Sequence, residues 1–142
     1  MQKVLLPFDG SESAKHAVQY LVDASRSHAS LEVHVLNVQP PTVLHGEYFS
    51  QEMLARIRAD ALKHGADVNA QAVRKLSEAG IQCTPHESVG EVIAEIRDAV
   101  TAFGCDTIVM GTRGMSSFSN LVLGSVASRV VHDVSVPVLL VK

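Results

Sequence analysis

A segment rich in glycine and serine lies between two apolar stretches at residues 111–125 (GTRGMSSFSNLVLGS). Gly111, Gly114 and Gly124 follow the spacing G-x2-G-x9-G, and Ser125 comes directly after them. Glycine adopts positive φ freely, so successive N–H groups of such a loop can converge on an anion. Free N–H groups at the start of the next helix favour phosphate, and Arg113 can add a charge-assisted contact. The segment predicts a phosphate-binding loop in which Ser125 either caps the helix or bonds a phosphate oxygen.

A second polar turn, Pro7-Phe8-Asp9-Gly10-Ser11, follows the first apolar run of the chain. Asp9 is the best candidate for a ligand-facing carboxylate, although aspartate is common in turns. Ser11 is expected to cap a helix rather than to act as a nucleophile. This turn is the second segment with the chemistry of a binding loop.

Apolar periodicity places these two loops in an alternating order of strands and helices. Strands are expected over residues 4–8, 31–38, 81–87, 106–110 and 137–141. Helices are expected to begin near Ser11 and Ser50, over residues 90–103, and after the glycine-rich segment. Strict alternation predicts parallel strands with helices on both faces, an α/β fold in one domain over residues 1–142. In such sheets ligands bind at the carboxyl ends of the strands, where the strand order reverses.

Single residues refine this prediction. Gly65 lies inside the long second helix and weakens the case for its continuity. Gly80 suits the position just after that helix, and Pro85 predicts that the third strand is an edge strand. The last strand is expected at the other edge, where unpaired main-chain groups invite a partner.

Composition narrows the function classes. The 142 residues carry a net charge of −3 and 46% hydrophobic residues, which indicates a globular protein and no broad basic surface for nucleic acid. Cys83 and Cys105 lack a close motif and are expected to be reduced thiols of a cytoplasmic protein. No apolar run approaches the length of a membrane span. The seven histidines lack a tight zinc-ligand spacing, so no protein-held metal is expected.

These motifs together resemble the universal stress protein family over the whole chain. The opening VLLPFDGS (residues 4–11) is similar to the family's first strand and turn, and DTIVMGTRG (106–114) to its most recognisable segment. LGSVA (123–127) and VPVLLV (136–141) are similar to its closing motifs. One departure is Glu91, where many members have proline after the glycine; this segment opens a helix away from the expected phosphates.

The resemblance implies an open five-stranded parallel sheet with strand order 3-2-1-4-5, similar to the adenine nucleotide alpha hydrolases. Because the glycine pattern is intact, it also implies the branch of the family that binds ATP, with AMP or ADP as alternatives and Mg²⁺ on the phosphates. A homodimer formed through residues 136–141 is implied as well. The residues expected to contact the nucleotide are Pro7, Asp9, Val38, Met110, Gly111, Arg113, Gly114, Gly124, Ser125 and Val126.

The functional hypothesis is a stress-response regulatory module that binds ATP. An enzyme on the same fold is the first alternative, but the loop has no lysine, and neither H-x-G-H nor S-G-G-x-D-S occurs in the chain. Slow ATP hydrolysis is the most that this pattern predicts. The second alternative is an interaction protein that holds no nucleotide.

Overall fold

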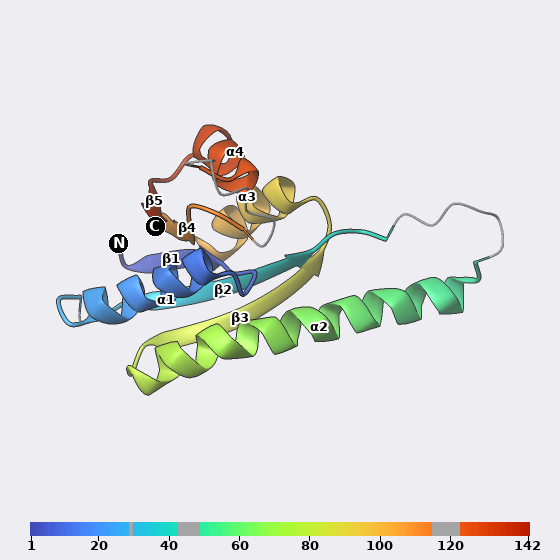
Figure 1. Ribbon diagram of the computed structural model, residues 1–142, viewed down its shortest axis with the longest axis horizontal. Helices are drawn as coiled ribbons and strands as arrows, with labels where there is room; N and C mark the ends of the chain where they lie inside the picture. Colours follow the sequence, from blue (N-terminus) through green and yellow to red (C-terminus); the bar gives the residue numbers. More distant parts are fainter. Residues whose placement is uncertain (29, 43–48, 115–122) are drawn as a thin grey trace.

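The structure is a computed structural model that describes residues 1–28, 30–42, 49–114 and 123–142. The described residues form five strands: β1 (Lys3–Pro7), β2 (Glu32–Gln39), β3 (Gln82–Val89), β4 (Thr107–Gly111) and β5 (Val138–Val141). They also form four helices: α1 (Glu12–Ser25), α2 (Gln51–Glu78), α3 (Val92–Phe103) and α4 (Ser125–Asp133). The predicted alternation of strands and helices is confirmed (Figure 1). No helix of the described ranges combines the length and the hydropathy that a membrane crossing requires.

The five strands pair in the order β3-β2-β1-β4-β5, and all pairs are parallel. The order that the resemblance implied is therefore confirmed. From β1 the chain moves outward through β2 to β3, and then returns to the other side of β1 for β4 and β5. The loops after β1 and β4 consequently leave the sheet side by side, at its topological switch point.

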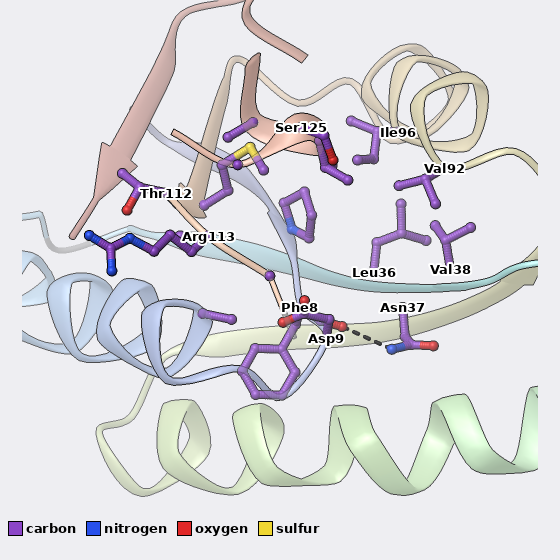
Figure 2. A pocket seen from close by; sticks show the side chains of 18 residues that line it. Phe8, Asp9, Leu36, Asn37, Val38, Val92, Ile96, Thr112, Arg113 and Ser125 are labelled. Atoms are coloured by element: carbon purple, nitrogen blue, oxygen red, sulfur yellow. Dashed lines mark hydrogen bonds between the residues drawn. The ribbon is translucent and has the colours of Figure 1, made fainter. Parts of the chain in front are cut away.

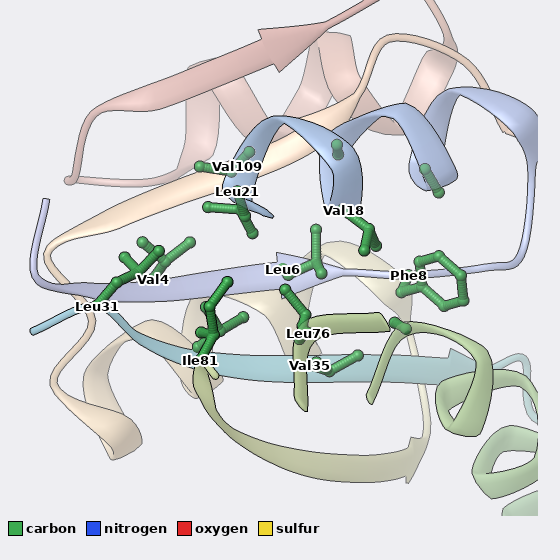
Figure 3. Close-up of a cluster of buried hydrophobic side chains, with 14 residues drawn as sticks. Val4, Leu6, Phe8, Val18, Leu21, Leu31, Val35, Leu76, Ile81 and Val109 are labelled. Carbon is green, nitrogen blue, oxygen red and sulfur yellow. The ribbon is translucent and has the colours of Figure 1, made fainter. Parts of the chain in front are cut away.

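The sheet buries side chains on both faces, because successive residues of a strand point in opposite directions. Val4 and Leu6 of β1 point into a core shared with α1 and α2, where they pack with Leu21 and Leu76 (Figure 3). Leu5 points into the opposite core, formed with α3 and α4. All five side chains are inaccessible to solvent. These two cores hold β1 and its following loop in place.

The expected helix caps account for how α1 and α2 begin and end. Ser11 accepts a hydrogen bond from Ala14 N, so its predicted capping role is confirmed, and Ser50 caps α2 in the same way. Gly80 follows α2 with φ +76°, the left-handed conformation expected there. Helix α2 continues unbroken through Gly65. At Gly65 a Cβ would come within 2.8 Å of Asn37 Oδ1, so the glycine lets the helix approach β2.

Two predicted boundaries were wrong by two residues. Helix α3 begins at Val92 rather than near residue 90, because Glu91 is its N-cap and accepts a hydrogen bond of 2.8 Å from Ala94 N. That bond holds the pKa of Glu91 below its ordinary value. Glu91 also lies 3.2 Å from Arg129 Nη1 of α4, so it joins the two helices on this face. Strand β3 extends to Val89 because it stays paired with β2 through Gln39.

Strands β3 and β5 form the edges of the sheet, and Pro85 lies in β3 as predicted. Ile108 N of β4 donates to Pro137 O just before β5, and Thr112 N just after β4 donates to Val141 O. Main-chain groups alternate in direction along a strand, so those of Val138 and Leu140 point to the open edge.

A histidine pair that the sequence did not predict joins β2, β3 and α3. His34 Nδ1 lies 2.8 Å from His86 Nε2, and His34 Nε2 lies 3.0 Å from Glu32 Oε1. With both rings neutral, His34 donates to the Glu32 carboxylate and His86 donates to His34. Both rings stack on Phe103, with centroid distances of 3.9 Å for His86 and 4.9 Å for His34. Burial lowers the pKa of His86, repulsion from His34 when both rings are protonated lowers it further, and Glu87 opposes the shift.

This cluster predicts a loss of stability in weak acid. Because the folded pKa of His86 is lowered, the unfolded chain takes up the proton first as the pH falls below about 6.5. The stabilising contribution is therefore complete above that pH and is lost as the pH falls through the folded pKa. We expect His86→Gln to lose less unfolding free energy than the wild type between about pH 7.5 and about pH 5.5, measured by urea unfolding. His64→Gln, on the exposed side of α2, is the control, and identical pH profiles for wild type and His86→Gln would contradict the assignment.

Candidate functional site

A pocket of about 370 Å³ opens at the carboxyl ends of β1, β2 and β4 and is called here the switch-point pocket. All ten residues expected to contact a nucleotide line it: Pro7, Asp9, Val38, Met110, Gly111, Arg113, Gly114, Gly124, Ser125 and Val126. The structure thus brings the two predicted loops and the end of β2 to one place. That these residues bind a ligand stays a prediction. Residues 115–122 of the glycine-rich segment lie outside the described ranges.

The remaining lining residues were not predicted: Phe8, Ala14, Leu36, Asn37, Val92, Ile96, Thr112 and Ala127. Val92 and Ile96 do belong to the apolar face that helical spacing predicts for α3. Periodicity marks a buried face without showing which part of it borders a cavity. Only the pairing of strands and the packing of α3 reveal that part.

The switch-point pocket has an apolar end and a polar end. Figure 2 shows four side chains of β2 and α3 gathered at the apolar end: Leu36, Val38, Val92 and Ile96. Thr112 and Arg113 lie at the opposite, polar end, and Ser125 at the start of α4 lies along one side of the pocket, near Ile96 in the view of Figure 2. Such a division suits a ligand with a flat apolar ring at one end and an anionic group at the other.

Gly111 is required where α1 crosses the end of β4. A Cβ at this position would lie 2.6 Å from Ser13 C and 2.7 Å from Ala14 N, distances that no packed side chain tolerates. The close approach lets the Ser13 hydroxyl donate a hydrogen bond to Arg113 O and accept one of 3.1 Å from Arg113 N. Ser11 Oγ is also within 3.4 Å of Arg113 O. The hydroxyls of the α1 N-cap and of its first turn therefore fix the main chain of the loop after β4, a contact that the sequence did not reveal.

Gly114 and Gly124 also stand where space is short. A Cβ at Gly114 would lie 3.1 Å from Asp9 Oδ2, so the Asp9 carboxylate faces this loop directly. Asp9 Oδ1 in turn accepts a hydrogen bond of 2.9 Å from Ser11 N. Gly124 donates to Thr112 O at 2.6 Å, which closes the loop between β4 and α4. The two predicted loops are thus held against each other.

The start of α4 is open toward the switch-point pocket. The N-cap is Gly124, with φ −68° and ψ 159°, and within the described residues no side chain bonds the first N–H groups of α4. The interpretation of Ser125 as the cap is therefore wrong, because Ser125 is the first residue of the helix itself. Uncapped N–H groups at a helix start, together with the helix dipole, favour a bound anion.

An amide side chain from β2 supports the floor of the switch-point pocket. Asn37 Nδ2 donates a hydrogen bond of 2.9 Å to Phe8 O, which Figure 2 shows as a dashed line. Gln39 Nε2 donates to Asn37 Oδ1 at 2.7 Å. Asn37 is only 3% exposed, so these bonds form away from competing water. They tie the turn before Asp9 to the end of β2.

Fold and pocket define an open parallel α/β protein with a pocket at the switch point of its sheet. The family model of the universal stress protein family matches residues 1–142, and the chain belongs to that family. Universal stress protein YxiE of Bacillus subtilis is 28% identical over 146 residues, covering 99% of this chain and 98% of its own. A Thermus aquaticus universal stress protein, encoded in the QAH/OAS sulfhydrylase 3′ region, is 32% identical, covering 98% and 97%.

Solved structures share the fold over nearly the whole chain. The hypothetical protein MJ0577 superposes with a TM-score of 0.82 at 26% identity, covering 99% of this chain and 95% of its own. A universal stress family protein of Arabidopsis thaliana with AMP bound gives a TM-score of 0.73 at 22% identity, with 100% and 92% coverage. The Archaeoglobus fulgidus universal stress protein in complex with dAMP gives 0.67 at 21% identity, with 100% and 98% coverage.

Gly111→Ala is expected to destabilise the fold by about 1–3 kcal/mol, because the new methyl group meets main-chain atoms of α1 that can move only with the helix. Urea unfolding measures the difference in the free energy of unfolding. Gly114→Ala is the matched control, since its new methyl group meets only the tip of the Asp9 side chain. The free energy of unfolding of this variant should fall by less than about 1 kcal/mol. Equal stability of the two variants would contradict this account of Gly111.

Proposed function

We propose that this chain binds an adenine nucleotide, ATP foremost, in the switch-point pocket and acts as a stress-response regulatory module. The observation that carries the proposal is the pocket itself, with its apolar end and its open α4 start facing one cavity. Structural neighbours with bound AMP, cAMP and dAMP support an adenine nucleotide as the ligand. Membership of the universal stress protein family supports the regulatory role.

In this proposal the adenine ring occupies the apolar end. Val38 and Met110 contact the ring, while Val92 and Ile96 close the wall from α3. A flat ring gains there from burial and from dispersion contacts with branched side chains. Asp9, in the loop after β1, accepts hydrogen bonds from the ribose hydroxyl groups in this proposal.

The phosphates occupy the polar end of the switch-point pocket. Main-chain N–H groups of Gly114, Ser125 and Val126 and the Ser125 hydroxyl supply the donors. Mg²⁺, when present, is carried by the phosphates, because this ion prefers substrate oxygens and water to a cage of protein ligands. Within the described ranges no group of three His, Cys, Asp or Glu side chains is placed to hold a metal.

We propose binding rather than rapid turnover as the role of the site. Asp9 is the carboxylate that lines the switch-point pocket. The described lining of this pocket includes neither lysine nor histidine. Fast phosphoryl transfer requires a positioned base and cations on the transferred group. The proposal accordingly allows ATP hydrolysis only at a slow rate.

We also propose that two copies pair through β5. Val138 and Leu140 leave main-chain groups unpaired along this edge within the described structure, and the side chains of β5 are only half-buried. Val131 of α4, 45% exposed, adds apolar surface to the C-terminal part of the chain. Pairing of two β5 edges would satisfy these groups and cover the strand.

The assignment of the phosphate site is tested with the double variant Gly124→Ala/Ser125→Ala. The new methyl group at position 124 would lie 3.1 Å from Thr112 O and 3.3 Å from Arg113 Cα, which displaces the loop, and the second change removes the hydroxyl donor. We expect the affinity for ATP, measured by titration calorimetry, to fall about tenfold or more. Ser135→Ala, an exposed serine outside the pocket, is the control. Unchanged ATP affinity in a folded double variant would rule out the assigned site.

The β5 interface is tested by Val138→Pro, which removes an outward-pointing N–H group and leaves the ladder to β4 intact. Sedimentation analysis should show a dimer for the wild type and a monomer, or a dimer with at least tenfold weaker association, for the variant. Val138→Thr keeps the N–H group and β-branching, so it should remain dimeric. A monomeric wild type, or a proline variant that dimerises normally, would refute pairing through this edge.

A further inference from the structure

A second cavity of about 730 Å³ adjoins the switch-point pocket and is called here the side cavity. It lies between the first turns of α1, the loop after β4 and the residue that follows β5. Its lining consists of Gly10, Ser11, Glu12, Ser13, Lys15, His16, Thr112, Arg113, Gly114 and Lys142. Thr112, Arg113 and Gly114 line both cavities, so the two spaces meet across this short piece of main chain.

Positive charge predominates in the side cavity. Lys15, Arg113 and Lys142 line it, against the single side-chain carboxylate of Glu12. Glu12 lies 2.9 Å from Lys15 Nζ, and this partner lowers the pKa of Glu12. Within the described residues no carboxylate lies within ion-pair distance of Arg113 or Lys142. Among the described residues the side chains of Arg113 and Lys142 therefore lack a carboxylate side-chain partner, which leaves them available for an anion.

The side chain of Arg113 is directed away from the apolar end of the switch-point pocket. In Figure 2 its guanidinium group extends from the loop after β4 toward α1, on the side opposite Val38 and Val92. A monophosphate at the start of α4 would leave this charge at the far side of the loop. A longer phosphate chain that passes over the main chain of Gly114 would approach the Arg113 guanidinium group.

The walls of the side cavity are fixed before any ligand arrives. Ser13 holds both main-chain polar groups of Arg113. On the opposite wall His16 Nδ1 donates a hydrogen bond of 2.8 Å to the main-chain oxygen of Lys142, which ties the end of β5 to α1. Walls that are ordered before binding reduce the entropy cost of binding. Cationic side chains on such walls therefore attract an anion even when they are partly exposed.

We propose that the side cavity is the subsite for the distal phosphates of the bound nucleotide, and that Lys15, Arg113 and Lys142 make the protein select nucleoside triphosphates over monophosphates. This inference rests on the proposed nucleotide function of the switch-point pocket. The first phosphate stays at the start of α4, and the following phosphates cross the shared wall into the side cavity. Each added phosphate brings negative charge and acceptor oxygens that the cations neutralise.

The test separates the subsite from the nucleotide site by using two ligands. Affinities for AMP and for ATP are measured by titration calorimetry at low salt, with and without Mg²⁺. In Lys15→Gln/Lys142→Gln we expect ATP affinity to fall about fivefold or more, while AMP affinity changes less than about twofold. Glu12→Gln removes the opposing carboxylate, so its ATP affinity should rise and its AMP affinity should stay constant.

The matched control is Lys63→Gln/Lys75→Gln, which changes the net charge equally at two exposed positions of α2. If the ratio of ATP to AMP affinity falls equally in both lysine pairs, the effect comes from net charge and the subsite is refuted. If AMP binds and the ratio stays at the wild-type value in Lys15→Gln/Lys142→Gln, the subsite is refuted while the nucleotide function stands. If the wild type binds neither ligand, the proposed function fails and the subsite fails with it.

Discussion

The close approach of α1 to the end of β4 is the constraint on which the rest of the site depends. Because Gly111 carries no side chain, the first turn of α1 reaches the loop after β4 and holds Arg113 through Ser13. The loop after β1 leads directly into α1, so this contact fixes both loops of the switch point at once. Without it the shared wall between the switch-point pocket and the side cavity would have no fixed position.

A buried polar network supports the same site from the α2 side of the sheet. Asn37 joins Phe8 O, and Gly65 lets α2 come close to the Asn37 side chain. One helical turn further along α2, Asn69 is fully buried and donates to His86 O and to Glu87 Oε1. The Asn69 amide thus ties α2 to the end of β3 through two hydrogen bonds, while the close approach at Gly65 packs α2 against the end of β2. Helix α2 therefore supports the pocket floor although it contributes no residue to the described lining.

Periodicity predicted the elements and the glycine spacing predicted the loop after β4, because both signals lie within short stretches of sequence. The other expected pocket residues, such as Pro7 and Val38, came from the resemblance to the universal stress protein family. Strand alternation and helical spacing follow from which faces must be buried, and that requirement is visible residue by residue. The His34–His86 pair spans 52 positions and the Ser13–Arg113 contact spans 100, so nothing in the local sequence marks them. Glu91 was read as a departure from the family pattern, yet it caps α3, because a carboxylate side chain can replace the usual short polar cap.

The glycines of the pattern can serve packing or ligand binding, and the structure separates these two roles. Gly111 and Gly124 are needed for packing against Ser13 and Thr112, whether or not a ligand is bound. A protein on this fold could therefore retain both glycines for stability alone. The case for a nucleotide instead depends on features that packing does not require: the open start of α4, the apolar end of the pocket and the uncompensated charge of Arg113. An anion would compensate this charge and the free N–H groups together, because both border the same loop.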